Sequence, residues 1–253
     1  MPRGVNMYDE GRIQQRNFSA SDNIQIISPG FITDGLLLAL DAGNYSSYPA
    51  SGTVWSDLSG NRNNGTLTNG PTFNTNNGGY IVFDGTNDYI NCGTDLAISG
   101  SWTISGFVRS SVSSATQIII QRSSGSPSYF QNYGIFIVNN NKFGCATSAD
   151  SYKRVESSTT MATNTWYYVT GLYNSATKIL SIYINGNFEA SSTALVNDPP
   201  TTGTQYTTLG SGDGLSVSNR LTGNIAHASI YTRVLSASEI LQNFNATRAR
   251  FGI

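Results

Sequence analysis

Apolar and polar positions alternate along residues 166–191, and this pattern predicts three antiparallel β-strands in succession. In the middle strand Leu180, Ile182 and Ile184 share one face, because successive side chains of a strand point to opposite sides. An Asn-Gly pair follows directly and is typical of a two-residue hairpin turn, since both central positions of that turn require positive φ. The stretch therefore indicates an antiparallel sheet with one apolar face.

Further apolar or alternating segments recur along the chain, joined by turns rich in Gly, Asn and Ser and by a longer loop over 45–71. The predicted strands include 36–44, 79–85, 88–91, 102–109, 118–121, 133–138, 142–147, 207–210 and 221–231. About a dozen short strands at this spacing predict an all-β fold in which two antiparallel sheets form a sandwich.

One short helix is predicted near the C-terminus. Ser236 and Glu239 have the spacing of a capping box, in which the hydroxyl accepts from a backbone N–H three residues on and the carboxylate reaches back. Ile240, Leu241 and Phe244 then form an apolar stripe. We expect this helix to cover one end of a sheet.

Residues 1–33 differ from the rest of the chain, because they are polar and have little periodicity. We interpret 1–33 as an N-terminal arm and 34–253 as one folded domain. An unstructured terminus is one alternative. The other is a segment that becomes ordered on a partner, which the short apolar run near its end favours. The arm residues expected to contact a partner are Arg3, Tyr8, Arg12, Arg16, Phe18, Ile24 and Ile26.

Composition restricts the classes of function. Charged residues make up 11% of the chain, against about 25% in ordinary soluble domains. The formal net charge is −1, so nucleic acid is not expected as a partner, since phosphate binding requires clustered Lys and Arg. The first residues contain no apolar run, so we expect no signal peptide, and no segment has the length and apolar character of a membrane span.

Cys92 and Cys145 are the two cysteines. They form either a disulfide or two free thiols. Free thiols are favoured, because no signal peptide is expected and disulfides are rare in reducing compartments.

The acidic residues and the histidine do not form a recognisable catalytic pattern. Glycoside hydrolysis needs two carboxylates at a fixed separation, and the glutamates are Glu10, Glu156, Glu189 and Glu239, none of them in an alternating acidic run. His227 is the single histidine, so any Ser-His-Asp triad would have to use it, and a structural role is the simpler interpretation. We therefore predict that the chain is not an enzyme.

Asp84 and Asp88 flank a predicted turn. Aspartate in a turn commonly accepts hydrogen bonds from the local backbone, and we favour this interpretation. The alternative is a calcium site, because Ca²⁺ takes the carboxylate and carbonyl oxygens that such a loop contains. No other cofactor is expected.

A series of short motifs occurs in a fixed order between Gly35 and Asn245. They are Trp55–Asn61 with Asn64–Thr66, Phe83–Gly85 with Asp88–Ile90, Trp102–Ser105, Trp166–Val169, Ile182–Gly186, Leu209-Gly210, Gly223–Ile225, Ile230–Ser236 and Glu239-Ile240. In order and spacing they resemble the concanavalin A-like lectin/glucanase superfamily, specifically its laminin-G and pentraxin-like modules. The resemblance implies a jelly roll of two curved antiparallel sheets, whereas function does not follow from that fold.

The chain departs from the family pattern at two places. Ala226 and His227 stand where many relatives carry an acidic pair, so any role of that pair in binding calcium is absent. The alternating carboxylates of the glucanase branch are also missing.

One hypothesis of function is a structural part of a virion. The C-terminal residues Arg248, Arg250, Phe251 and Gly252 lie in an ending that resembles virion proteins of tailed bacteriophages. The resemblance implies a capsid decoration protein or a tail or fibre component, attached through its arm to other virion proteins or to copies of itself. The expected location is the virion, with the cell surface or extracellular space, reached without a signal peptide, as the alternative.

The second hypothesis is a carbohydrate-binding or adhesion module, and it is compatible with the first. Sugar rings stack on aromatic faces, and several aromatic residues lie in or near predicted loops, with core packing as the alternative for each. The candidates for glycan stacking are Tyr45, Tyr48, Trp55, Tyr129, Tyr152 and Tyr206.

Overall fold

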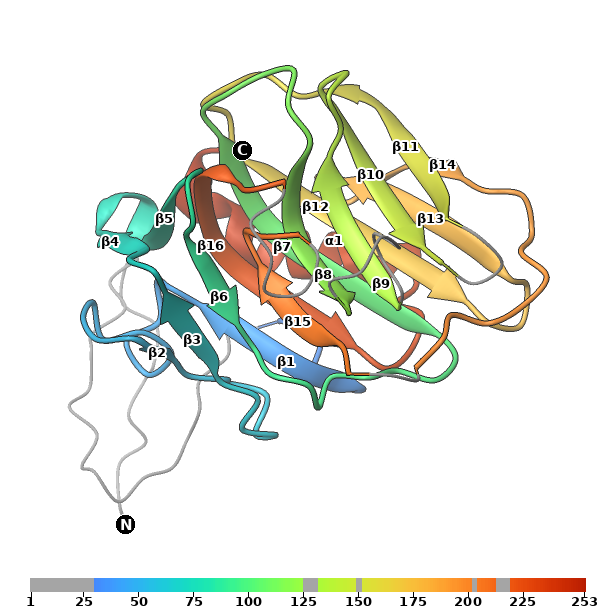
Figure 1. The fold of residues 1–253 in the computed structure, drawn as a ribbon, viewed down its shortest axis with the longest axis horizontal. Coiled ribbons are helices and arrows are strands. Elements are labelled where there is room, and N and C mark those ends of the chain that lie inside the picture. The colour runs from blue at the N-terminus through green and yellow to red at the C-terminus, as the bar shows by residue number, and fades with distance from the viewer. Residues whose placement is uncertain (1–29, 125–131, 149–151, 202–203, 213–218) are drawn as a thin grey trace, which may run out of the picture.

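The computed structural model describes residues 30–124, 132–148, 152–201, 204–212 and 219–253. Within these residues two antiparallel sheets pack face to face, with one α-helix at their side (Figure 1). The predicted all-β sandwich with a short C-terminal helix is confirmed.

The first sheet, sheet A, is organised around its longest strand, β16 (Thr222–Tyr231). β7 (Trp102–Ser110) pairs along one side of β16, while β5 (Tyr80–Asp84) and β1 (Leu36–Asp41) share the other side. The sheet continues outward through β12 (Tyr167–Asn174), β13 (Ile179–Ile184) and β14 (Asn187–Ser191) beyond β7, and through β4 (Thr72–Asn74) beyond β5.

The second sheet, sheet B, lies against it. Its spatial order is β11 (Lys153–Thr160), β10 (Lys142–Thr147), β9 (Tyr133–Ile137), β8 (Gln117–Ser123), β15 (Tyr206–Leu209), β6 (Tyr89–Asn91), β3 (Gly65–Thr68) and β2 (Val54–Trp55).

The three strands predicted over 166–191 are β12, β13 and β14, paired in that order. Asn185 and Gly186 have φ of 51° and 80°, so the turn between β13 and β14 uses two positive-φ positions, as predicted.

Three strands of the structure lie in polar segments for which the sequence pattern predicted no strand. β2 and β3 lie within the region predicted as a loop over 45–71, and the pattern does not predict β11 at all. β11 is an edge strand that is largely solvent-exposed, so its sequence lacks the apolar alternation on which the prediction depends. β2 and β3 are too short to show a period.

Large aromatic side chains from both sheets fill the space between them. Trp102 on β7 and Tyr133 on β9 are fully buried, with ring centroids 5.9 Å apart, and Tyr173 on β12 lies 6.2 Å from Trp102. Because each such ring buries a large apolar area, this layer stabilises the stacking of the two sheets.

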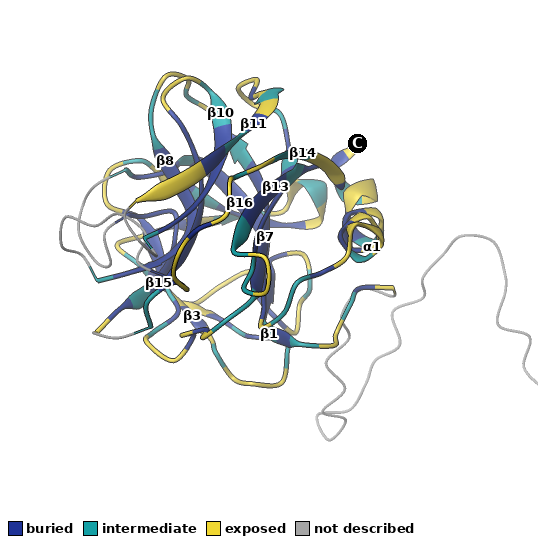
Figure 2. Ribbon diagram, turned by 90° about the vertical axis from the view of Figure 1, so that its right-hand side faces the viewer, coloured by how far each residue is buried: buried dark blue, intermediate teal, exposed yellow. Residues whose placement is uncertain are grey.

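The outer face of sheet A is covered by the C-terminal segment. α1 (Ala237–Thr247) and the 3₁₀ helix η2 (Arg248–Phe251) pack there, and Figure 2 places α1 on the side of β7 and β13, away from β8 and β10. Phe251 stacks on Phe107 with ring centroids 4.3 Å apart. The helix begins at the predicted N-cap, where the Ser236 side chain accepts from the backbone N–H of Glu239. Within the described residues no helix has the length and apolar character needed to cross a membrane.

A carboxylate closes one end of the sandwich. β14 is the edge strand of sheet A and β11 the edge strand of sheet B. Glu189 on β14 accepts from the backbone N–H groups of Ser158 and Thr159 on β11, at 2.9 Å each, and from the Thr159 hydroxyl at 2.7 Å. These bonds occupy backbone donors at the edge of sheet B.

Candidate functional site

The outer face of sheet B carries a row of polar side chains across four neighbouring strands. Gln121 on β8, Thr208 on β15, Asn91 on β6 and Thr66 on β3 are successive cross-strand partners. A sequence neighbour of each of them belongs to the core between the sheets. Since side chains alternate along a strand, the row itself faces outward.

Accessibility increases along this row toward β3. Gln121 and Thr208 are buried, Asn91 is half-buried and Thr66 is exposed. The Gln121 amide donates to the Ser123 hydroxyl at 3.1 Å, and the Thr208 hydroxyl donates to a backbone carbonyl at 3.0 Å. The buried half of the row is thus engaged in the protein's own structure, and beyond it the sheet becomes apolar, with the buried cluster Ile118, Phe136, Val138 and Ala146.

Tyr206 lies on the same outer face, two residues before Thr208 on β15, and is half-buried. Its cross-strand partner on β8 is Ser123. On the β6 side the chain continues as Gly93, where an added Cβ would meet nothing within 4 Å. The ring is therefore bordered by small groups on both sides, an arrangement that can receive the apolar face of a sugar ring. We call Tyr206 and the row Gln121–Thr208–Asn91–Thr66 the polar face.

The structure excludes two of the other aromatic candidates as stacking residues. Trp55 is fully buried and Tyr48 is 4% exposed, because β2 and the loop before it pack onto the core instead of projecting from it. Tyr45 and Tyr152 are 78% and 41% exposed, but neither belongs to the polar face. Tyr129 lies outside the described residues.

One exposed aromatic side chain was not among the residues predicted from the sequence. Phe188 on β14 is 57% exposed, and its ring centroid lies 5.4 Å from that of Tyr183 on β13. Its position directly after the predicted Asn-Gly turn was the available signal, since residues next to a hairpin turn at a sheet edge are commonly exposed.

The motif around Asp57 is structural. One Asp57 oxygen accepts from the backbone N–H groups of Ala39 and Ser59, at 2.9 Å each, and the other accepts from the N–H of Asn63 at 3.0 Å. These bonds hold the loop after β2 along β1. Asp57 therefore acts as a backbone clip and is buried.

Asp84 and Asp88 bond within the turn between β5 and β6. Asp84 accepts from the N–H of Thr86 at 2.7 Å, which lowers the pKa of Asp84. Asp88 accepts from the N–H of Asp84 at 3.0 Å, while burial raises the pKa of Asp88. Among the described residues no group of three or more His, Cys, Asp or Glu side chains is arranged to hold a metal ion. The turn interpretation accounts for both carboxylates, and calcium binding stays a prediction.

The described glutamates have structural partners. Glu156 forms an ion pair with Arg154 at 2.7 Å, Glu189 closes the sandwich edge, and Glu239 caps α1. Glu10 lies outside the described residues.

His227 lies on β16 beneath Phe31, with ring centroids 5.0 Å apart in an edge-on contact. It is 3% exposed, and burial lowers the pKa of His227 to about 4, so the imidazole is neutral near pH 7. A buried neutral ring under a phenylalanine has the structural role that the sequence predicts.

The Arg-Phe ending also has an internal role. Arg250 forms an ion pair with Asp41 and donates to the backbone carbonyls of Asn77, in the 3₁₀ helix η1 (Asn76–Gly78), at 3.1 Å and of Gly79 at 2.9 Å. Together with Phe251 it fastens the C-terminal segment to sheet A. The residues that carry the resemblance to virion proteins therefore stabilise the domain itself.

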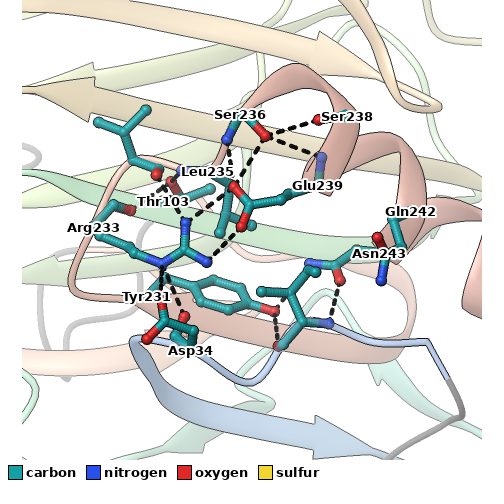
Figure 3. A network of polar contacts seen from close by, with 12 residues as sticks. Asp34, Thr103, Tyr231, Arg233, Leu235, Ser236, Ser238, Glu239, Gln242 and Asn243 are labelled. Atoms are coloured by element: carbon teal, nitrogen blue, oxygen red, sulfur yellow. Dashed lines mark hydrogen bonds and ion pairs between the residues drawn. The ribbon is translucent and has the colours of Figure 1, made fainter.

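The described end of the arm packs against β16 and α1 (Figure 3). Phe31 is buried, and the backbone of Ile32 donates to Asn243 at 2.8 Å and accepts from the Tyr231 hydroxyl at 2.8 Å. Phe31 and Ile32 thus belong to the packing of the domain, upstream of the predicted boundary after residue 33.

Arg233 fixes the neighbouring contacts. Its guanidinium lies between the carboxylates of Asp34, at 2.9 Å, and Glu239, at 2.7 Å (Figure 3). The same Glu239 lies in the capping box of α1, so the start of the domain and the start of the helix share one charge network.

The arm meets the domain on the sheet A side. The carbonyl of Gly30 accepts from Gln242 on α1 at 2.6 Å, and Gly30 lines a shallow hollow of about 470 Å³ on that helix. The polar face lies on the opposite side of the sandwich. The expected partner-contacting residues, all outside the described part of the chain, are Arg3, Tyr8, Arg12, Arg16, Phe18, Ile24 and Ile26.

Both cysteines are free thiols and buried. Burial raises the pKa of Cys92 to about 12 and raises that of Cys145 as well. The interpretation as two free thiols agrees with the structure.

Two antiparallel sheets packed face to face define a β-sandwich domain. The family model described as the concanavalin A-like lectin/glucanases superfamily matches residues 84–241, and the chain belongs to this superfamily. The resemblance found in the sequence is thus confirmed. No curated protein matches the chain.

Solved structures share the fold at low sequence identity. The binding domain of Paraclostridial Mosquitocidal Protein 1 has a TM-score of 0.65 and 17% identity, over 85% of this chain and 52% of that one. A structure of botulinum neurotoxin type C, a toxin whose cell entry is dependent upon interaction with two ganglioside molecules, has a TM-score of 0.61 and 17% identity, over 85% of this chain and 52% of that one. A mutant Trypanosoma rangeli sialidase has a TM-score of 0.64 and 16% identity, over 88% and 34%.

The chain therefore spans about half of the toxin structures and about a third of the sialidase. Identity at this level establishes a shared fold, and the activities of those larger proteins are not assigned by it.

Proposed function

We propose that this chain is a non-enzymatic structural protein of a virion whose lectin-like domain binds a surface glycan through the polar face. The observation that carries the proposal is that the arm and the polar face lie on opposite sides of the sandwich. The arm joins the domain at Gly30 and Phe31 beside α1, while the polar face lies across sheet B on the far side. A module anchored on one side presents the other to a ligand.

An aromatic ring and neighbouring polar groups on the polar face support glycan binding. Tyr206 provides a half-buried ring bordered by small residues, and Asn91 and Thr66 provide polar groups on the same face. Aromatic rings with adjacent hydrogen-bonding groups suit the two kinds of surface that a sugar presents. A toxin whose cell entry is dependent upon gangliosides shares this fold, which supports glycan binding by the fold. Gangliosides are acidic, so this likeness does not indicate the class of glycan that this chain binds.

The test of glycan binding is a glycan array followed by titration of the best ligand. We expect Tyr206→Ala to weaken binding about tenfold, as loss of an aromatic contact does, and Tyr206→Phe to retain most of it. Tyr45→Ala is the matched control, because Tyr45 is 78% exposed and lies outside the polar face. Equal effects of the two alanine variants, or an array without a ligand, would contradict the proposal.

The virion role is supported by the resemblance of the C-terminal sequence to virion proteins and by the polar arm. Its test is deletion of residues 1–29 in the producing phage. We expect the truncated chain to fold, because it keeps the described contacts of Gly30 and Phe31 with the domain, and to be absent from purified particles. Incorporation at the normal level would exclude the arm as the attachment.

A further inference from the structure

The described residues that make up the polar face are all uncharged. Tyr206, Thr208, Gln121, Asn91 and Thr66 are all neutral, and so is Ser123 beside them. A carboxylate or sulfate on a bound sugar would lose water without gaining a cation, which is costly.

Three arginines near this face are already engaged, and a fourth, the exposed Arg62, lies in the loop between β2 and β3, outside the polar face. Arg122 is 3% exposed, and its guanidinium donates to Gln205 and, at 3.0 Å, to the carbonyl of Thr94. Arg220 is 8% exposed, and its guanidinium lies 5.3 Å from the ring centroid of Tyr89. Arg154 is paired with Glu156 on the far edge strand β11. None of the three is positioned to pair with an anionic group at Tyr206.

The accessible groups are neutral hydrogen-bonding groups. The side-chain oxygen of Asn91 accepts from the backbone N–H of Gly93 at 2.9 Å, and its amide nitrogen has a donor capacity that this bond does not use. In the described part of the chain, no residue hydrogen-bonds to the hydroxyl of Thr66 or of Tyr206. An amide and two hydroxyls match the hydroxyl groups of a neutral sugar.

The spacing of these groups sets the length of the ligand. Tyr206 is on β15, Asn91 on β6 and Thr66 on β3, and adjacent strands lie about 4.8 Å apart, so the groups extend over about 10 Å across the strands. This span exceeds one sugar ring, so a single terminal residue does not reach from Tyr206 to Thr66.

We infer that the ligand is a neutral oligosaccharide that lies across β15, β6 and β3, with one ring on Tyr206 and a second near Thr66. This inference rests on the proposed function and adds the chemical class and the orientation of the ligand. A terminal acidic sugar is the class that it excludes.

The experiment uses an array that carries neutral oligosaccharides, each beside its sialylated form and its terminal monosaccharide. We expect neutral chains to bind at least about tenfold better than their sialylated forms. Thr66→Val keeps the size and removes the hydroxyl, and we expect it to weaken binding of the oligosaccharide about two- to tenfold, as loss of one hydrogen bond does, without changing binding of the monosaccharide. The matched control is Thr72→Val, an exposed threonine on β4 of sheet A.

The possible outcomes separate the class of the ligand, its orientation and the proposed function itself. A preference for sialylated chains overturns the neutral class while glycan binding stands. Equal effects of Thr66→Val and Thr72→Val overturn the extended orientation. An array without any ligand removes the proposed function and this inference with it.

Discussion

The outer faces of the two sheets differ in what covers them. On sheet A, aromatic side chains such as Phe107, Tyr168 and Trp166 are packed beneath α1 and η2, and ion pairs fasten that cover at Asp41 and Glu239. On sheet B, a polar row ends in accessible side chains, and no helix in the described residues lies over it. One face thus contributes to stability, and the other is the face that we propose for glycan binding, so substitutions on the two faces should separate these properties.

The largest effect on this comparison is expected from Phe251→Ala. Phe251 is 8% exposed and stacks on Phe107, so its truncation should lower the free energy of unfolding by about 3 kcal/mol. Urea denaturation followed by tryptophan fluorescence measures this loss, and Trp166, whose ring centroid lies 4.7 Å from that of Phe251, contributes to the signal. Leu241→Ala on α1, 43% exposed, is the control, and a cost no greater than that of the control would show that the cover does not stabilise sheet A.

Acid should weaken the sheet A side through His227. Burial lowers the pKa of His227 to about 4, against a pull in the opposite direction from Asp41, so the folded state favours the neutral ring. The stabilisation is complete above pH 6.5, where the unfolded chain is also neutral, and is lost as pH falls toward 4, by up to about 3 kcal/mol. Unfolding measured at several pH values should show this slope, and His227→Gln should remove that component. An unchanged slope in the variant would assign it to other groups.

A smaller loss is expected from Glu239→Gln. The carboxylate accepts from Arg233 and from the backbone N–H of Ser236, at 2.7 Å and 2.8 Å, and the lost cap and ion pair should cost about 1 kcal/mol. A double-mutant cycle with Arg233→Ala measures the shared part by thermal denaturation. Strict additivity of the two substitutions would contradict the charge network.

The smallest effect on stability is expected from Tyr206→Phe, at under about 0.5 kcal/mol, because Tyr206 is half-buried at the surface and keeps its ring. A melting temperature equal to that of the unmodified protein, within error, is the expected result. A loss comparable to that of Phe251→Ala would make Tyr206 part of the packing and remove it from the polar face.

The fold was largely predictable because the alternation of apolar and polar residues shows which face of a strand is buried. Leu180, Ile182 and Ile184 alternate with more exposed residues, and Ser236 with Glu239 marks the start of α1. The edge strand β11 was not predictable in the same way, since its pairing depends on backbone bonds to β10 and on Glu189 from a distant segment.

The polar face was predictable only in part. Tyr206 was identified as one aromatic among several, whereas its alignment with Asn91 and Thr66 depends on the register of β15, β6 and β3, which are far apart in sequence. Trp55 and Tyr48 show the converse: both lie in a polar segment, and only the packing of that segment on the core reveals that they are inaccessible.

The Glu189 contact has a consequence for self-association. Sheets with open rims tend to add strands from other molecules and grow into polymers. Here the Glu189 side chain joins the edge strands β14 and β11, and it occupies backbone N–H groups of β11. Those groups are then not available to a strand from a second copy, even at high local concentration. Glu189→Ala should expose these backbone donors, and we expect light scattering to record more self-association of the variant than of the unmodified protein.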